Sequence, residues 1–222
     1  MSSTRILRKS YDLILKNTKI RKKNLVPEVY LHLLDTTCPW YYRKEIPELE
    51  NDPFWSVFWP GGQVLSRFIL DNKEVVKCKN VLDFGCGCGA LGIAAKKVGA
   101  KSVVCNDIDQ LAMAAVELNF KLNKLDPPFL LTDDLLKPSS LSKLEKTSIF
   151  MGDMFYDEVM AKKILAWCKR SCQSKNTIYI GDPGRWGLDF IRDSITKVAE
   201  YEIIDEDCDE YRTAAVFQFQ SN

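Results

Sequence analysis

The chain contains the stretch Val81-Leu82-Asp83-Phe84-Gly85-Cys86-Gly87-Cys88-Gly89-Ala90, in which an apolar run leads into three alternating glycines. Glycine permits a tight turn and lets a ligand lie against the backbone, and a helix that starts there offers free N–H groups. The stretch therefore predicts a nucleotide-cofactor loop between a strand and a helix, with Gly85, Gly87 and Gly89 at the cofactor. It does not choose the cofactor, since it also satisfies the dinucleotide pattern G-x-G-x-x-G/A.

Outward from this loop, β-rich runs alternate with amphipathic helical runs. Strands are predicted over 80–84, 101–107, 129–133, 148–153 and 177–182, and helices over 90–99, 110–123 and 157–172. This alternation indicates a parallel sheet with right-handed crossovers. Two further strands, 201–207 and 212–220, are joined by a link too short for a crossover helix, so they must pair antiparallel. The fold class predicted is α/β, a Rossmann-like, seven-stranded, mostly parallel sheet with a C-terminal antiparallel hairpin and an N-terminal extension.

The charges are divided unevenly along the 222 residues. Lys and Arg number 31 against 30 Asp and Glu, but residues 1–24 hold eight basic residues and one acid, which leaves 23 basic against 29 acidic residues in the rest. That composition is typical of an amphipathic organelle-targeting presequence, and a solvated basic helix of a cytosolic protein is the alternative. The totals argue against a chain-wide nucleic-acid footprint, and no apolar run approaches the roughly 18 residues of a membrane span.

We divide the chain into the basic tail 1–24, an N-terminal extension 25–79 that covers the cofactor, and the main domain 80–222. In the extension, 26–34 is predicted as a short helix and 65–72 as a longer one. The eight cysteines form no C-x-x-C pair, and His32 is the only histidine, so we expect buried reduced thiols and no metal site.

Two carboxylates near the loop point to the kind of cofactor. Asp107 ends the second strand, where a carboxylate can accept hydrogen bonds from ribose hydroxyls. Asp83 stands just before the glycines and suits an amino-bearing ligand. The antiparallel ending is not that of a dehydrogenase, and no His or Lys stands out as a hydride-transfer partner. These features favour a class I methyltransferase that uses S-adenosylmethionine.

The exit of the fourth predicted strand reads Gly152-Asp153-Met154-Phe155-Tyr156-Asp157. It falls at the carboxyl edge, where open α/β sheets bind ligands. Asp153 could hold a substrate ammonium, and Tyr156 could wall its approach by a cation–π contact. A helix cap is the alternative, which explains Asp157 but neither of the other two. The run 126–129, Asp-Pro-Pro-Phe, is similar to a tetrapeptide of nucleic-acid amino-methyltransferases, but it lies before the third strand, so we interpret it as a loop.

Several motifs together resemble a known family. FWSVFWPGGQ (54–63), VLDFGCGCGA (81–90), NDID (106–109), GDMFYDE (152–158) and GDPGR (181–185) are similar to the electron transfer flavoprotein beta subunit lysine methyltransferases. These belong to the seven-β-strand protein lysine methyltransferases that share an Asp-x-x-Tyr signature. The resemblance spans roughly residues 25 to 220, and the order of WPGGQ, DMFY and GDPGR is its specific part.

The resemblance implies S-adenosylmethionine as cofactor, trimethylation of lysines on the flavoprotein beta subunit, and a mitochondrial matrix location, with the cytoplasm as the alternative. It implies that Asp153 and Tyr156 hold the target lysine, and that the cofactor is bound by Trp59, Gln63, Gly85, Gly87, Gly89, Asp107 and either Asp133 or Asp134. Asp83 joins the expected cofactor site because of its place just before the glycines. We expect a monomer. A related methyltransferase acting on another protein or a small amine, a non-catalytic cofactor-binding module, and an NAD-dependent oxidoreductase remain as alternatives.

Overall fold

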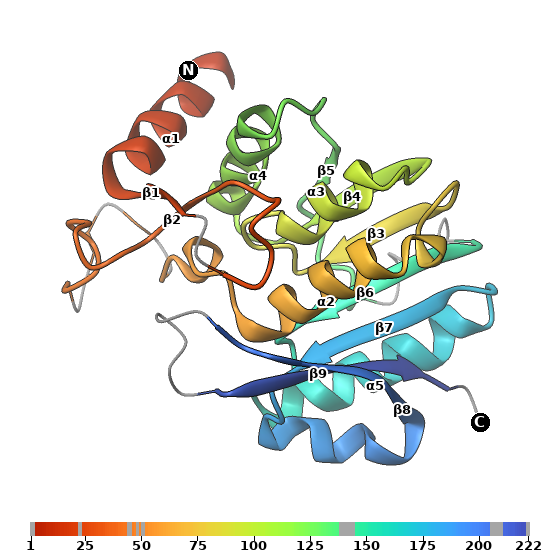
Figure 1. Cartoon of the computed structure of the whole chain (residues 1–222). Helices are drawn as coiled ribbons and strands as arrows, with labels where there is room; N and C mark the ends of the chain where they lie inside the picture. The colour runs from red at the N-terminus through yellow and green to blue at the C-terminus, as the bar shows by residue number, and fades with distance from the viewer. Residues whose placement is uncertain are drawn as a thin grey trace.

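The structure is a computed structural model of the whole chain, shown in Figure 1. It describes residues 3–21, 24–43, 46–47, 49, 52–137, 145–204 and 211–220. Within these ranges the chain forms one large sheet covered by helices and a small two-stranded sheet near the N-terminus.

The large sheet has seven strands in the order β5-β4-β3-β6-β7-β9-β8. The first five in this order are parallel, and β9 runs antiparallel between β7 and β8. The predicted α/β sheet with its antiparallel ending is therefore confirmed. Its strands are β3 (Asn80–Phe84), β4 (Ser102–Asn106), β5 (Phe129–Leu131), β6 (Thr147–Gly152), β7 (Thr177–Asp182), β8 (Ile195–Glu202) and β9 (Thr213–Phe219).

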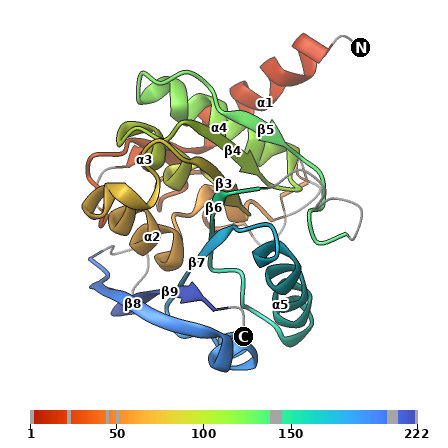
Figure 2. The same cartoon turned by 90° about the vertical axis from the view of Figure 1, so that its right-hand side faces the viewer.

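Helices cover both faces of this sheet. One face carries α2 (Pro60–Asp71), α3 (Ala90–Lys97) and α4 (Gln110–Leu122), and α5 (Glu158–Cys172) lies on the other, as Figure 2 shows. Short 3-10 helices are η1 (Phe54–Ser56), η2 (Lys73–Val75) and η4 (Trp186–Ser194). Side-chain caps begin two of the helices, because Asp109 accepts a hydrogen bond from Leu111 N–H and Asp157 from Met160 N–H. The helices thus start at the carboxyl edge of the sheet, where the site lies.

The N-terminal residues form α1 (Ser3–Asn17), β1 (Lys19–Arg21) and β2 (Leu31–Leu33), with β1 and β2 antiparallel. The short helix predicted over 26–34 is wrong. Leu31 and Leu33 are buried on either side of the half-buried His32, an alternation that a strand satisfies and a helix does not. The backbone N–H of His32 donates to the Asn119 side chain of α4.

The strand predicted over 201–207 begins earlier, at Ile195, and ends at Glu202; residues 205–207 lie outside the described ranges. β8 is the last strand of the sheet and carries exposed polar residues such as Lys197 and Glu200. These residues interrupt the apolar run by which a strand is predicted from sequence. The helix predicted over 65–72 begins at Pro60 and packs on β6, β7 and α3, so this part of the predicted extension is a layer of the main fold. Within the described ranges, no helix has both the length and the apolar character to cross a membrane.

Candidate active site

The glycine loop between β3 and α3 is shaped by backbone conformations that other residues rarely adopt. Gly85, Gly87 and Gly89 have φ values of +66°, +50° and +76°. A Cβ on Gly85 would lie 2.7 Å from the Met154 sulfur, and one on Gly89 would lie 3.0 Å from Val116. At Gly87 the nearest atom, Trp55 Cα, would be 3.6 Å away, which is an ordinary van der Waals contact. Crowding is therefore tightest at Gly85 and Gly89, whereas the positive φ favours glycine at all three positions.

Asp107 lies beside this loop, at the end of the neighbouring strand β4. Its Oδ2 accepts a hydrogen bond from Gly87 N–H at 3.0 Å, and its Oδ1 accepts one from Asp109 N–H at 3.1 Å. Burial raises the pKa of its carboxyl, against the backbone N–H groups of Asp109, Gly87 and Ile108, which lower it. A carboxylate can accept about four hydrogen bonds, so Asp107 keeps acceptor capacity for a ligand with adjacent hydroxyls.

Asp83 lies beneath the loop, at 4% exposure. Its Oδ2 accepts a hydrogen bond from Gly92 N–H in the first turn of α3, at 3.0 Å. Burial raises the pKa of Asp83 to about 8; the Gly92 N–H lowers it and the charge of Asp107 raises it further. In this arrangement Asp83 joins the strand to the start of the helix.

Asp133 and Asp134 follow β5 at the same edge of the sheet. The Asp133 carbonyl accepts a hydrogen bond from the Asn106 side chain at 2.9 Å, and Asp134 accepts one from Leu136 N–H. Asp133 is exposed and Asp134 half-buried. The structure thus brings the glycine loop, Asp107 and this pair along the ends of β3, β4 and β5, as the sequence predicted.

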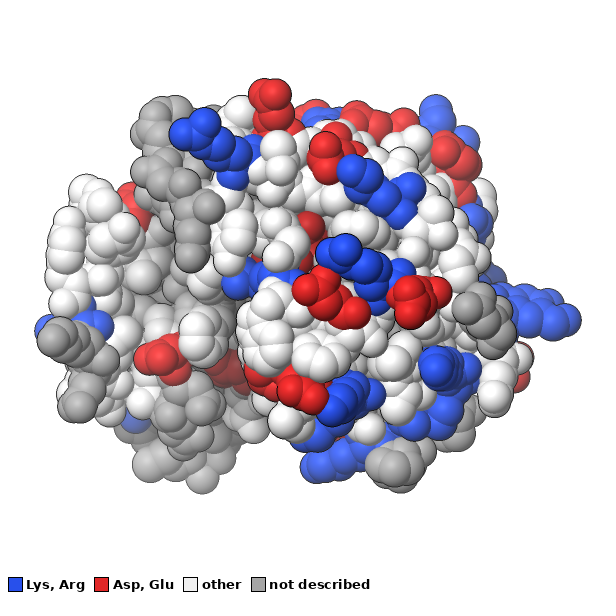
Figure 3. Space-filling view, turned by 90° about the horizontal axis from the view of Figure 1, so that it is seen from below, with Lys and Arg blue, Asp and Glu red and all other residues white. Residues whose placement is uncertain are grey.

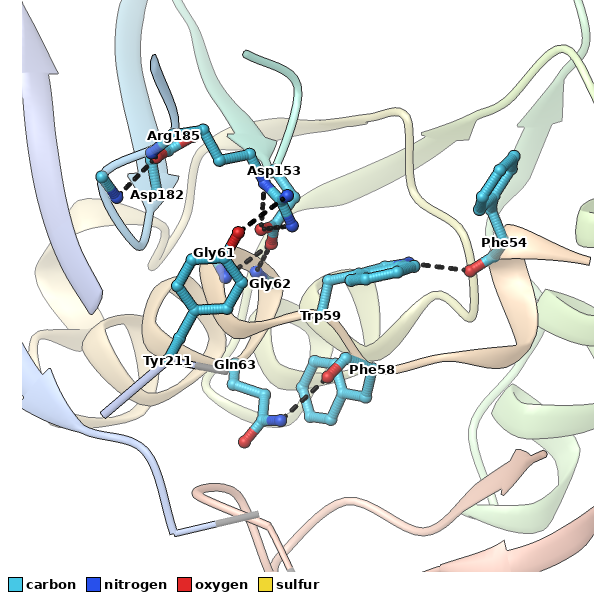
Figure 4. Close-up of polar contacts among 11 residues, drawn as sticks. Phe54, Phe58, Trp59, Gly61, Gly62, Gln63, Asp153, Asp182, Arg185 and Tyr211 are labelled. Atoms are coloured by element: carbon cyan, nitrogen blue, oxygen red, sulfur yellow. Dashed lines mark hydrogen bonds and ion pairs between the residues drawn. The ribbon is translucent and has the colours of Figure 1, made fainter. Parts of the chain in front are cut away.

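Trp59 and Gln63 stand at the start of α2. The indole N–H of Trp59 donates to the Phe54 carbonyl at 2.9 Å, and its ring faces the Arg185 guanidinium (Figure 4). Gln63 is fully buried; its side-chain N–H donates to the Phe58 carbonyl, and its Oε1 accepts from Leu25 N–H. Gln63 therefore connects the N-terminal extension to α2, and Trp59 faces Arg185.

Glycines let the start of α2 touch the ends of β6 and β7. A Cβ on Gly61 would lie 2.1 Å from the Gly181 carbonyl oxygen, and one on Gly181 would lie 2.2 Å from the Gly61 oxygen. A Cβ on Gly152 would lie 2.8 Å from Gly62 N. The glycines of the WPGGQ, GDMFY and GDPGR motifs therefore meet at one place, which we call the glycine seam (Gly61, Gly152 and Gly181).

Asp153, which the sequence placed at the target lysine, lies directly beside this seam. Its φ is +57° and its side chain is 6% exposed. Oδ2 accepts hydrogen bonds from Gly61 N–H at 2.5 Å and Gly62 N–H at 3.2 Å. Oδ1 accepts two from Arg185, Nε at 3.2 Å and Nη2 at 3.0 Å (Figure 4). Burial raises the pKa of Asp153, although these donors pull it down. All four acceptor positions of this carboxylate are occupied.

Arg185 was in the quoted GDPGR motif, but no role for it was predicted. Its guanidinium lies between two rings, 5.6 Å from the centre of Trp59 and 5.2 Å from that of Tyr211. Burial would lower its pKa, but the charge of Asp153 and their hydrogen bonds raise it, so Arg185 is a cation. Asp182 anchors the turn, since its Oδ1 accepts from Gly184 N–H at 2.7 Å and Arg185 N–H at 2.6 Å. Tyr211 lies just before β9 and reaches Arg185 only through the folding of the chain.

Tyr156 lies on the rim of the site, with 49% of its surface exposed. Burial and the charges of Asp157 and Asp107 raise the pKa of its hydroxyl. Its carbonyl accepts a hydrogen bond from the indole N–H of Trp186 at 3.1 Å, and the Trp186 ring packs edge-on against Phe190 at 5.5 Å. These three exposed aromatics, Tyr156, Trp186 and Phe190, form what we call the aromatic rim.

The fold and site can be compared with known proteins. A family model described as ribosomal protein L11 methyltransferase (PrmA) matches residues 64–161. The human electron transfer flavoprotein beta subunit lysine methyltransferase is 39% identical over 212 residues, 92% of this chain and 80% of the human protein. Its Xenopus laevis counterpart is 44% identical over 179 residues, 78% and 69% of the two chains.

Among solved structures, the N-methyltransferase NodS from Bradyrhizobium japonicum WM9, in complex with S-adenosyl-L-homocysteine, has the same fold. It superposes with a TM-score of 0.54 at 16% identity, over 78% of this chain and 94% of that chain. The strand order, the antiparallel ending and the left-handed glycine loop beside Asp107 define a class I methyltransferase. At the identity and coverage found with the human and Xenopus proteins, this chain belongs to the electron transfer flavoprotein beta subunit lysine methyltransferase family.

Proposed function

We propose that this methyltransferase transfers methyl groups from S-adenosylmethionine to lysine side chains of the electron transfer flavoprotein beta subunit. The observation that carries the proposal is the 39% identity to the human enzyme over 92% of this chain and 80% of the human protein. The geometry adds independent support, since the half-buried carboxylate of Asp107, which keeps acceptor capacity, stands beside the glycine loop. That donor set fits the ribose of a nucleoside cofactor.

The site has a cofactor side and an acceptor side, and different residues form each of them. Gly85, Gly87 and Gly89 would let the cofactor lie along the backbone, Asp107 would accept hydrogen bonds from its ribose hydroxyls, and Asp133 or Asp134 would lie at its base. When bound, S-adenosylmethionine supplies a methyl group on a positively charged sulfur, which a neutral amine can take without further activation. The acceptor side must therefore bind a lysine, remove its proton and exclude water.

Direct assay tests this function. Purified chain is incubated with electron transfer flavoprotein and methyl-labelled S-adenosylmethionine, and the modified lysines are mapped by mass spectrometry. We expect label on beta-subunit lysines, up to three methyl groups on each. Label on other targets of a peptide array, with none on the beta subunit, would favour a related methyltransferase. Binding of S-adenosyl-L-homocysteine without any transfer would indicate a cofactor-binding module.

The proposed location is the mitochondrial matrix. The eight basic residues and single acid of residues 1–24 support it, since that composition suits import. Fractionation of cells that express the chain with a C-terminal tag would test it, and recovery in the cytosol alone would contradict it.

The proposed working form is a monomer that binds no nucleic acid. The near-neutral total charge of the chain supports the second point. Light scattering after gel filtration, with and without added RNA, would test both points.

A further inference from the structure

We propose that Trp59, Asp153 and Tyr211 form a cage for the cationic side chain of the substrate, and that Arg185 holds this cage when no substrate is bound. The inference rests on the proposed function in one respect, namely that the acceptor is a lysine. The inference adds which residues form the acceptor site, and it adds that the side chain of Arg185 has to move out of this site before the substrate binds.

The hydrogen bonds of Asp153 require this exchange. Both of its oxygens already accept two N–H groups, so a lysine can bind to the carboxylate only if a donor leaves. Two of the donors are backbone groups of α2, fixed by the glycine seam. The other two belong to the side chain of Arg185, which is therefore the donor that can leave.

The two rings give the cage its preference for a cation. Trp59 and Tyr211 lie on either side of the Arg185 guanidinium, at 5.6 and 5.2 Å from their centres (Figure 4). Such rings attract any cation near their faces, whether or not it can donate hydrogen bonds. A lysine that has lost its N–H groups to methylation is still attracted, so the same cage serves each successive methyl transfer.

The charges favour replacement over simultaneous binding. Asp153 with Arg185 forms one buried ion pair, with side-chain exposures of 6% and 17%. A second cation beside this pair would meet Arg185 at short range in a poorly solvated place, which costs energy. If the lysine ammonium replaces Arg185, the carboxylate keeps one positive partner until the lysine gives up its proton for methyl transfer.

The chain around Arg185 allows its side chain to move while the backbone stays. Asp182 fixes the backbone N–H groups of Gly184 and Arg185. The guanidinium has one more tether, a 3.3 Å hydrogen bond from Nη1 to the Tyr211 hydroxyl. The long side chain can therefore rotate away from a turn that remains in place.

A binding measurement tests the cage without methyl transfer. The probe is n-butyltrimethylammonium, titrated into the full chain and followed by the NMR signal of the Trp59 indole N–H. We expect Arg185→Ala to bind the probe at least about 5-fold more tightly than the unchanged chain, and Arg185→Ala/Tyr211→Ala to lose this gain. Arg192→Ala is the matched control, because Arg192 pairs with exposed Asp189 outside the site, and its affinity should match the unchanged chain. Equal affinity in all variants would overturn the cage.

Kinetics give the second readout. With electron transfer flavoprotein as substrate, Arg185→Ala should lower KM several-fold and leave kcat within about 3-fold, because the competitor for the cage is gone. If Arg185→Ala does not fold, Arg185→Gln keeps an amide donor for Asp153 and removes the charge. A kcat reduced about 100-fold or more with KM unchanged, in a variant of normal thermal stability, would make Arg185 a positioning residue and overturn the exchange. Failure of the proposed function gives a different result. In that case the unchanged chain would not methylate the flavoprotein, but binding of the probe would still depend on Arg185.

Discussion

The two aspartates Asp107 and Asp153 differ in how many hydrogen bonds they can still accept, and this difference fits the separate roles proposed for them. Asp107 accepts one hydrogen bond on each oxygen from Gly87 and Asp109, whereas Asp153 accepts two on each. We expect Asp107→Asn to weaken S-adenosyl-L-homocysteine binding about 10- to 100-fold, because the amide nitrogen cannot accept a hydrogen bond. Isothermal titration calorimetry measures this. The control Asp126→Asn, in an exposed loop, should bind normally; equal affinity of the two variants would remove Asp107 from the cofactor site.

Asp83 makes the stability of the protein depend on pH. Its pKa is about 8 in the folded chain, whereas an unfolded Asp has a pKa near 3.8, so the folded chain retains a proton that the unfolded chain releases. Stability should therefore fall as pH rises between these values. Asp83→Asn, which stays neutral, should raise the melting temperature at pH 8 by at least roughly 2–4 °C and change it little at pH 4. Scanning calorimetry at both pH values measures this. Asp182, with a pKa of about 7, contributes part of the same fall, so some slope should remain in the variant.

The sequence predicted the positions of the proposed cofactor-binding residues more completely than those of the residues around Asp153. Gly85, Gly87, Gly89 and Asp107 follow directly after strands, and the ends of neighbouring parallel strands must meet. Arg185 and Tyr211 could not be placed in this way, since they meet Asp153 only through the packing of the last strands and the turn that Asp182 anchors. The sequence predicted Asp153 correctly at the carboxyl edge, but not that its acceptor positions were already filled.

At the scale of elements, the glycine seam sets how closely α2 approaches β6 and β7. Because a Cβ on Gly181 would lie 2.2 Å from the Gly61 oxygen, a backbone atom, the helix would have to shift. We expect Gly181→Ala to lower the free energy of unfolding by about 1–3 kcal/mol. Denaturant unfolding measures this. The control Gly62→Ala places its Cβ 3.5 Å from Phe58 and should keep or gain stability, and equal loss in both variants would contradict the seam.

The N-terminal elements are packed against the main domain, which bears on whether they can be removed. Ile14 of α1 is fully buried, the Tyr11 hydroxyl donates to Glu117 of α4, and β1 pairs with β2. A chain that begins at Leu25 should therefore lose about 2–4 kcal/mol of unfolding free energy. Comparing denaturant unfolding of the two chains checks this. An unchanged midpoint would mean that residues 1–24 are dispensable, as expected of a presequence removed after import.

The strands with the clearest apolar runs in the sequence are those with both faces covered by helices. Strands β3, β4, β6 and β7 are apolar because both of their faces are covered. In contrast, β2 has three residues and β8 lies at the sheet edge, so neither carries a long apolar run. These two strands owe their structure to their neighbours, which a single sequence does not display.

For the whole molecule, the surface suggests that contact with a protein substrate depends on the aromatic rim more than on one field of charge. Lys and Arg side chains are interspersed with Asp and Glu on the face seen in Figure 3. Tyr156, Trp186 and Phe190 are 49%, 56% and 38% exposed. Large aromatic side chains at the centre of a contact contribute a large share of binding energy.

Trp186 is therefore expected to matter for the protein substrate and not for the cofactor. Trp186→Ala should raise KM for electron transfer flavoprotein about 10-fold, because the loss of a large aromatic contact with a protein partner can cost more than about 1 kcal/mol. The dissociation constant for S-adenosyl-L-homocysteine should stay the same, since Trp186 lies on the rim and its indole N–H reaches only the Tyr156 carbonyl. Steady-state kinetics and calorimetry on the same preparation measure the two values. Ile20→Ala, a half-exposed apolar residue on β1, is the matched control and should leave both unchanged. An equal rise of KM in the control, or a weaker cofactor affinity in Trp186→Ala, would mean that the rim acts through the fold rather than by contact with the substrate.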